Sequence, residues 1–296
     1  MALAEFVDAH HHLWALKAVH YPWLMATGQR RFFGDPTPIQ RDYRVDDFLG
    51  EPGPFTPAAS VHIQVGAQDP LAETAWLNNQ LPFPHALVAF CDLAADDVDA
   101  QLAAQLSCAQ ARLRGVRQIV GRHEGEDELH GTDRLLSNPR WLSGLRLLES
   151  HALSFDLQLT PGQMVDALRV FERVPELPVA LCHAGSPWDQ SQEGLRRWRR
   201  GLEHFAELPN SVCKLSGLGM FKPDWILEDL KPVVMTVIDV FSPTRVMFGS
   251  NFPVDKLYRP YADYWSAYYK LTQGFSERER QAMFVGTARR FYRLSE

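Results

Sequence analysis

Short hydrophobic runs, rich in β-branched and aromatic residues, alternate along the chain with longer stretches that have helical periodicity. The runs predict eight buried strands, at residues 6–10, 60–65, 86–90, 115–120, 153–159, 178–183, 211–215 and 245–249. Their starts lie about 34 residues apart on average, the length of one strand-helix unit. Near-continuous apolar strands are typical of a parallel sheet buried on both faces. The pattern therefore predicts an α/β protein, a single (β/α)8 TIM barrel, over residues 1–296.

The segments between these runs carry signals for helix starts. Asp69 precedes Pro70, which combines an N-cap residue with proline at the first helical position. Capping boxes at residues 160–163 and 276–279 predict two further starts. Residues 195–205 carry an apolar stripe at helical spacing, and the arginines between its members predict a solvated helix face rather than a phosphate site.

Two connections are too long to be ordinary loops. Residues 14–59 contain repeated prolines, and residues 121–138 contain the acidic run HEGEDELHG. Loops of this length are usually lids or binding loops. Both follow a predicted strand, and such loops lie at the C-terminal face of a barrel, where barrel active sites form. We therefore expect residues 14–59 to be a lid-like insertion that enlarges the loop after strand 1.

Composition narrows the class of protein. Of the 296 residues, 46% are hydrophobic, which excludes disorder for the bulk of the chain. The formal net charge is −6, so we expect no nucleic-acid partner. No apolar run approaches the ~18 residues that cross a bilayer, and the N-terminal segment lacks the basic region of a signal peptide. The four cysteines are too dispersed for a metal or disulfide framework, and we expect a cytoplasmic protein that acts on a small molecule.

The sharpest candidate for chemistry is the run of three histidines at the end of the first predicted strand. Residues two apart in a strand point to the same side, so His10 and His12 converge at the barrel mouth while His11 points outward. Two such histidines can bind a metal ion. The alternative is a pair of hydrogen-bonded core residues.

Four motifs lie where barrel strands are expected to end: the pair His10 and His12, LCHAGSP at 181–187, KLSGL at 214–218 and MFGSNFPVD at 247–255. Together they resemble the lactonase branch of the amidohydrolase superfamily, which includes enzymes similar to fuconolactonase, rhamnonolactonase and pyrone-dicarboxylate lactonase. Weaker matches extend the resemblance over nearly the whole chain. The resemblance implies a TIM barrel that hydrolyses a small lactone, of the aldonolactone, muconolactone or pyrone type, to a hydroxy acid by means of an activated water.

The chain departs from the metal-dependent members of that superfamily. Those members usually add a lysine on strand 4, a histidine on strand 5 and an aspartate after strand 8, where this chain offers Arg117, Asp156 and Asn251. The resemblance therefore leaves two cofactor states open. One needs no cofactor and uses the histidines to hold the substrate carbonyl. The other has a single divalent metal, such as zinc, on His10, His12 and His183.

The position of Asn251 leaves the base of the reaction open. The family's aspartate at this position activates the hydrolytic water, and an amide cannot accept a proton at neutral pH. Asp255, in the same loop, is the leading replacement, although it can equally cap the following turn. His183 is the second, because the unperturbed histidine pKa near ~6.5 suits a general base. The residues predicted to be catalytic are His10, His12, His183, Asp255 and Asn251.

Six further residues are predicted to bind the substrate. Three tryptophans lie in expected loops, where aromatic faces can hold a sugar ring or a planar lactone. Two cations and one amide lie on strands 4, 5 and 7, where they can meet an oxyanion or a carboxylate. Ordinary packing or pairing with a nearby acid is the alternative for each. The six are Trp14, Trp23, Arg117, Gln158, Trp188 and Lys214.

Two other functions remain open at this point. The superfamily also includes metal-dependent decarboxylases of aromatic or muconate acids. A binding protein that keeps the pocket but not the reaction would also account for the missing strand-8 aspartate. The expected partner is a small-molecule lactone, with no membrane partner, and a homo-oligomer remains open.

Overall fold

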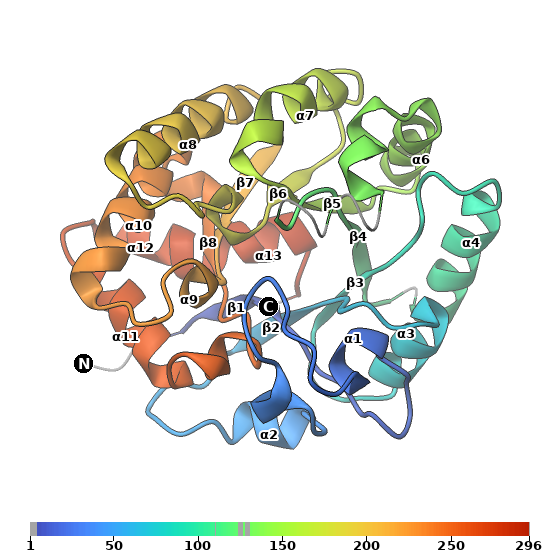
Figure 1. Cartoon of the computed structure of the whole chain (residues 1–296), viewed down its shortest axis with the longest axis horizontal. Coiled ribbons are helices and arrows are strands. Elements are labelled where there is room, and N and C mark those ends of the chain that lie inside the picture. The colour runs from blue at the N-terminus through green and yellow to red at the C-terminus, as the bar shows by residue number, and fades with distance from the viewer. Residues whose placement is uncertain (1–4, 110, 124–126, 128–130, 296) are drawn as a thin grey trace.

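The computed structural model describes residues 5–109, 111–123, 127 and 131–295. Eight parallel strands form one sheet in the order β1 to β8, with helices around it (Figure 1). The strands are β1 (Val7–His11), β2 (Ala59–Ile63), β3 (Ala86–Ala89), β4 (Leu113–Ile119), β5 (Ser154–Gln158), β6 (Val179–Leu181), β7 (Ser211–Leu215) and β8 (Val246–Phe248). Each overlaps a predicted strand, which confirms the (β/α)8 barrel.

The barrel closes just beyond the ends of β1 and β8. The backbone N–H of Asn251 donates to the carbonyl of His10 over 2.7 Å, and the N–H of His12 donates to the carbonyl of Phe252 over 2.7 Å. These bonds join the segment after β8 to the end of β1. They place His12 and Asn251, which are distant in sequence, beside each other at the mouth of the barrel.

A local irregularity in the pairing of β1 with β2 affects the direction in which the histidine side chains of β1 point. The partners Asp8↔Ser60 and His11↔His62 set three residue steps on β1 against two on β2, so β1 contains one extra residue. His11 consequently faces outward, where its ring stacks on Phe48 at a centroid distance of 4.1 Å. The rings of the two flanking histidines lie inside the barrel, as the alternation of strand residues predicts.

Three helical segments begin where the sequence signals place them. The carboxylate of Asp69 accepts hydrogen bonds from two backbone N–H groups of the first turn that follows it, and capping boxes form at residues 160–163 and 276–279. The helices are α1 (Pro22–Met25), α2 (Val45–Leu49), α3 (Pro70–Asn78), α4 (Val98–Ala109), α6 (Pro139–Ser150), α7 (Met164–Phe171), α8 (Gln192–Phe205), α9 (Leu218–Phe221), α10 (Leu227–Phe241), α11 (Tyr261–Leu271), α12 (Glu277–Gln281) and α13 (Thr287–Tyr292). Short 3-10 segments lie at Thr37–Ile39, Thr132–Ser137, Pro161–Gln163, His183–Gly185, Pro243–Arg245 and Asp255–Leu257, and a π-helical turn lies at Ala282–Gly286.

The outer helices present apolar faces to the sheet and charged faces to solvent. In α8, Trp198, Leu202 and Phe205 are buried, whereas the arginines of the same helix are exposed and pair with neighbouring acids. In α11, four aromatic side chains are buried against the barrel, so this helix covers the core. Within the described residues, no helix is both long and apolar enough to cross a membrane.

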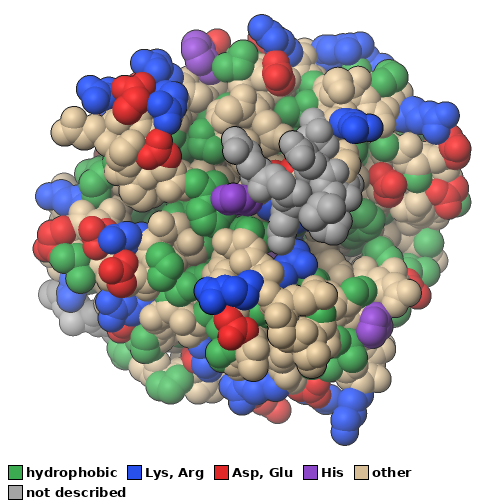
Figure 2. Space-filling model, in the orientation of Figure 1, with side chains coloured by type: hydrophobic (Ala, Val, Ile, Leu, Met, Phe, Trp, Pro, Cys, Tyr) green, Lys and Arg blue, Asp and Glu red, His purple; other side chains and the backbone are tan. Residues whose placement is uncertain are grey.

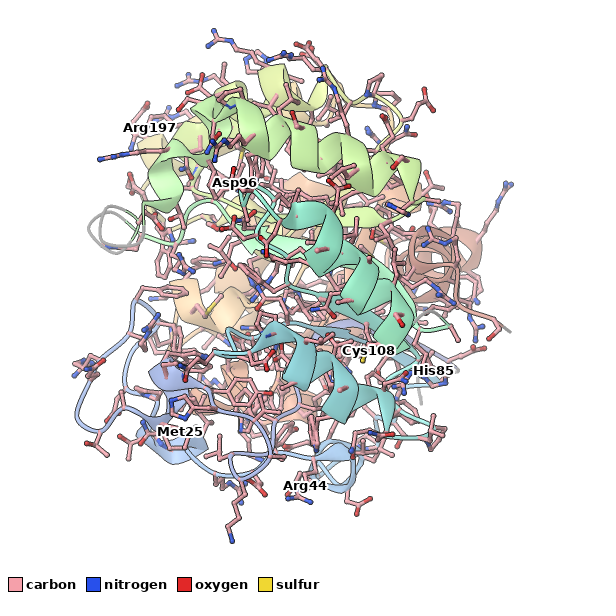
Figure 3. The ribbon with its side chains drawn as sticks, turned by 90° about the vertical axis from the view of Figure 1, so that its right-hand side faces the viewer. Met25, Arg44, His85, Asp96, Cys108 and Arg197 are labelled. Atoms are coloured by element: carbon pink, nitrogen blue, oxygen red, sulfur yellow. The ribbon has the colours of Figure 1, made fainter. Side chains whose placement is uncertain are left out.

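Residues 14–59 form an ordered excursion rather than a structureless loop. They contain α1, α2 and one 3-10 turn, and Trp14 and Tyr43 exchange two backbone hydrogen bonds of 2.9 and 3.0 Å. Figure 3 shows Met25 of this segment and Arg197 of α8 toward the same end of the barrel, with His85 and Cys108 toward the other. The excursion therefore lies at the end of the barrel where the strands terminate.

Candidate active site

A cavity of about 360 Å³ opens at the C-terminal end of the barrel. Figure 2 shows this face, with histidine and basic side chains visible beside the hollow near its centre. One wall is aromatic and comes largely from the first loop. The polar lining comes from several strand ends and comprises His12, Gln64, Asp92, Arg117, Gln118, Gln158, His183 and Asn251, together with Arg31, Arg122 and Thr132.

The cavity brings together only part of the residue set predicted from sequence. The predicted residues that line it are His12, Trp23, Arg117, Gln158, His183 and Asn251. His10 lies deeper, below the other two histidines, and Asp255 lies behind Asn251. Lys214 is paired with Asp156 inside the barrel and is fully buried.

The remaining two predicted residues hold loops instead of lining this cavity. The indole N–H of Trp14 donates to the carbonyl of Arg41 over 2.6 Å, inside the first loop. The indole N–H of Trp188 donates to the carbonyl of Arg122 over 2.9 Å, and the Trp188 ring borders a neighbouring cavity of about 280 Å³. Trp23 does line the main cavity, and its indole N–H donates to the carbonyl of Val65 over 2.6 Å.

Three histidine rings cluster at the floor of the cavity. The ring of His10 lies 5.2 Å from that of His12 and 4.5 Å from that of His183, measured between centroids. Glycines allow this approach: a Cβ atom at Gly249 would lie 2.6 Å from the His10 Cβ, and one at Gly217 would lie 2.5 Å from the His183 Nδ1. Neither ring nitrogen of His10 has a hydrogen-bond partner in the described part of the chain, although the side chain is fully buried.

His12 is held as a neutral imidazole. Its Nδ1 atom donates to the carbonyl of Ile63 over 2.7 Å, because a carbonyl can only accept. Burial, assisted by the nearby Arg117 cation, lowers the pKa of His12 to about 3. The Nε2 atom therefore carries a lone pair near neutral pH.

His183 begins the 3-10 turn after β6 and is also neutral. Its backbone has φ of 53°, a left-handed conformation that turns the side chain toward the cavity. The Nδ1 atom lies 3.0 Å from the hydroxyl of Ser216, which follows β7. Burial lowers the pKa of His183 well below its ordinary value, so the ring is neutral near neutral pH.

Asn251 and Asp255 form a buried pair after β8. The two side chains lie within hydrogen-bond distance, with Asn251 Nδ2 placed 3.1 Å from Asp255 Oδ1. The other end of the amide, Oδ1, lies 3.2 Å from His12 Nε2. Asp255 is fully buried, and burial raises its pKa to about 7. Asn251 therefore separates this carboxyl group from the cavity.

Arg117 supplies a buried cation to the same cavity. Its guanidinium donates to the Gln158 side chain over 3.3 Å and to the backbone carbonyl of Gln64 over 2.8 Å. Its Nε–H has no hydrogen-bond partner among the described residues, and no described carboxylate forms an ion pair with it. A carbonyl oxygen, oxyanion or carboxylate of a ligand would complement this group.

Sequence reasoning missed most of the wall that the first loop contributes. Arg31, Phe32 and Phe33 line the cavity from that loop, and Arg31 lies over the Trp23 ring at 5.9 Å. Their adjacency in sequence, two basic residues followed by two aromatic residues, is the local signal that would have identified them.

The donor set does not make a closed metal site. In the described ranges, no group of three His, Cys, Asp or Glu side chains is arranged to hold a metal ion. Asn251 stands after β8 where a carboxylate could have supplied an anionic ligand. In the described arrangement these side chains do not converge on a common point that would hold a zinc ion.

The fold and the site define a hydrolase-type barrel, with neutral histidines and a buried cation around a small cavity. Comparison with known proteins shows that the chain belongs to the amidohydrolase family, which it matches over residues 7–294. An uncharacterized protein, y4mH, of Sinorhizobium fredii is 36% identical over 99% of this chain and 100% of its own length. An L-fucono-1,5-lactonase of Burkholderia multivorans is 30% identical over 98% of this chain and 96% of its own length. The resemblance to the lactonase branch is thereby confirmed.

Solved structures agree with this family. An amidohydrolase of Burkholderia multivorans, crystallised with bound zinc, is 26% identical, with a TM-score of 0.81 over 99% of this chain and 100% of that chain. A 5-carboxyvanillate decarboxylase of Sphingomonas paucimobilis is more distant, with 15% identity and a TM-score of 0.61 over 98% of this chain and 99% of that chain. The second likeness shows the fold alone.

Proposed function

We propose that this protein opens a small lactone ring by hydrolysis. The observation that carries the proposal is the single cavity in which His12, His183, Asn251 and Arg117 meet beside an aromatic wall. Full-length relatives that are named lactonases support the choice of a cyclic ester among the carbonyl substrates that such a site can hold.

The electrophilic end of the lactone would lie at the floor of the cavity. The carbonyl oxygen would accept a hydrogen bond from Arg117, and a second one from Asn251 when the oxygen and nitrogen of its amide are exchanged. When water adds to the carbonyl carbon, the negative charge moves to this oxygen. Fixed donors in a buried site stabilise that charge strongly, because they need no reorganisation.

His183 is the base in this proposal. Its neutral ring takes a proton from the attacking water, and the hydroxyl of Ser216 orients the ring through Nδ1. The tetrahedral intermediate then collapses, the bond between the carbonyl carbon and the ring oxygen breaks, and the histidine returns the proton to the departing oxygen. The product is a hydroxy acid. Asp255 does not touch the water, because it lies behind Asn251.

The dimensions and lining of the cavity fit one ring. A volume of about 360 Å³ lies at the small end of ligand pockets. Trp23, Phe32 and Phe33 provide apolar surface for one face of the substrate. Gln64 and Gln158 provide amides for hydroxyl groups on the other face. These features favour a polar monocyclic lactone.

Proton release in weakly buffered indicator solution tests the proposal. The substrates are aldono-1,4-lactones, aldono-1,5-lactones, and muconolactone and pyrone types, each corrected for spontaneous opening. We expect turnover on at least one class and none in His183→Ala, with the surface variant Asp224→Asn as a matched control for handling. Failure on every class, or release of carbon dioxide from aromatic acids instead, would contradict the proposal.

A further inference from the structure

A continuous line of polar contacts runs from the barrel wall to a buried carboxyl group. It passes from the Ile63 carbonyl through the ring of His12 and the amide of Asn251 to Asp255, with separations of 2.7, 3.2 and 3.1 Å. The backbone on both sides of the amide is fixed, because Asn251 N–H donates to the carbonyl of His10 and the Asp255 N–H donates to the carbonyl of Asn251. The amide plane of Asn251 can therefore reorient without a change in the backbone.

The hydrogen-bonding roles along the line are not all complementary. Because His12 carries its proton on Nδ1, its Nε2 atom is an acceptor. That atom faces Oδ1 of Asn251, which is also an acceptor. Exchanging the oxygen and the nitrogen of the amide turns this repulsive pair into a hydrogen bond from Asn251 Nδ2 to His12 Nε2. Neutral His12 therefore prefers the exchanged amide.

The exchanged amide requires a hydrogen-bond donor at its other end, next to Asp255. Its oxygen then faces the Oδ1 atom of Asp255, which must carry a proton if it is to donate a hydrogen bond. The surroundings favour that proton. The described groups around the Asp255 carboxyl are the backbone N–H of Gly219 in α9, at 3.4 Å, and the neutral tyrosines Tyr258, Tyr264 and Tyr268, and no described cation forms an ion pair with it.

We propose that protonated Asp255 is a positioning residue, which donates to the Asn251 side-chain oxygen and so turns the Asn251 N–H groups toward His12 and the cavity. This inference rests on the proposed function in one respect: the second N–H of that amide would then meet the lactone carbonyl oxygen. Ionised Asp255 selects the opposite orientation, in which an amide oxygen faces the developing negative charge. The protonation state of Asp255, which does not contact the substrate, thus decides whether Asn251 presents a hydrogen-bond donor or an acceptor to the cavity.

The pH dependence of two Asp255 variants tests the inference. We expect wild-type kcat to fall as pH rises through the Asp255 pKa, which burial raises to about 7. Asp255→Asn keeps a donor next to Asn251, so it should lose this decline and retain kcat within about fivefold of the low-pH value. Asp255→Ala removes the donor and should lower kcat by roughly 10- to 100-fold at every pH, with a smaller change in KM. The surface variant Asp224→Asn should keep the wild-type profile.

An activity rise through the same pH range, with folded Asp255→Asn inactive, would overturn the inference, because Asp255 would then be the base. A wild-type alkaline decline that persists in Asp255→Asn would also overturn it. Infrared difference spectra of wild type minus Asp255→Asn provide a readout without substrate. A carboxylic-acid carbonyl band at pH 6 that disappears at pH 9 is expected. If the band is present but the protein opens no lactone, the proposed function is rejected and the inferred amide orientation stands. If the band is absent, the inference about Asp255 is rejected and the proposed function stands.

Discussion

The ammonium group of Lys214 lies 3.3 Å from the carboxylate of Asp156 inside the barrel, and both side chains are fully buried. Tyr292 of α13 donates its hydroxyl proton to the same carboxylate, with O–O distances of 2.7 and 3.0 Å. The C-terminal helix is thus tied to charges on β5 and β7. The cation that a substrate would need at this position is already neutralised by the protein.

Breaking this ion pair on one side should destabilise the protein. Lys214→Met leaves the Asp156 charge buried without its partner, which typically costs about 3–5 kcal/mol. The double variant Lys214→Met/Asp156→Asn removes both charges and should recover a substantial part of that loss. Urea unfolding of the three proteins measures both effects. Equal stability of wild type and Lys214→Met would show that the pair contributes nothing.

The two cavity histidines should be separately essential for turnover. His12→Ala removes the ring that fixes Asn251, and His183→Ala removes the base. Each should lower kcat at least ~100-fold, because general bases and oxyanion donors each contribute on that scale. Steady-state kinetics on the lactone that the wild type turns over fastest measure kcat for both variants, and circular dichroism checks that each variant is folded. Near-wild-type turnover in both variants would reject this site.

Arg117 should depend on the shape of its side chain as well as on its charge. The guanidinium donates to Gln158 and to the Gln64 carbonyl simultaneously, a geometry that an ammonium cannot reproduce. Arg117→Lys should therefore reduce kcat/KM by about 10- to 100-fold, on the scale of one transition-state donor. Steady-state kinetics at a fixed pH measure the kcat/KM of Arg117→Lys and of wild type. Arg169→Lys, on the exposed face of α7, is the matched control and should leave kcat/KM unchanged.

Metal removal should leave turnover in place. Among the described residues, no three His, Cys, Asp or Glu side chains are arranged to hold a metal ion. We expect kcat within about twofold of its starting value after dialysis against a chelator, since no step of the proposed reaction uses a metal. Metal analysis of the dialysed protein accompanies the assay. Activity that is lost on dialysis and restored by zinc would assign His10 and His12 as ligands instead.

Buried Glu73 should make the protein less stable at alkaline pH. Glu73 accepts a hydrogen bond from the Val65 N–H over 3.2 Å, and burial raises its pKa to about 7 from an ordinary value of 4.5. The folded state therefore holds this proton more tightly than the unfolded state does. The resulting stability is complete below the unfolded pKa and is lost as pH rises through 7, by about 3 kcal/mol at 1.36 kcal/mol per pKa unit.

Glu73→Gln does not ionise, so its Tm should fall less between pH 5 and pH 8.5 than the wild-type Tm does. Part of the decline remains, because burial also raises the pKa values of Asp8 and Asp255. The exposed variant Glu277→Gln is the matched control. Identical pH dependence of Tm in Glu73→Gln and wild type would refute the role given to Glu73.

The strands, the helix caps and the inward position of two histidines were all predictable from the chain. Alternation of apolar residues marks a strand, and an Asp69-Pro70 pair marks a helix start, because both depend on groups only a few residues apart. The motifs that contain His12, His183 and Asn251 likewise indicated strand ends that line the cavity. That these ends meet follows from the parallel order of the barrel.

The partners of the charged residues were decided by tertiary structure alone. Strand alternation predicts that the Lys214 side chain points into the barrel. How far it lies from the barrel mouth depends on the stagger of the neighbouring strands, which places Lys214 opposite Asp156 below the cavity. Asp255 lies four residues from Asn251, yet only the fold of that loop puts an amide between the carboxyl group and the cavity. Local sequence fixes the direction of a side chain, because direction is set by adjacent backbone angles. Contacts between distant strands set its partner, its burial and hence its pKa.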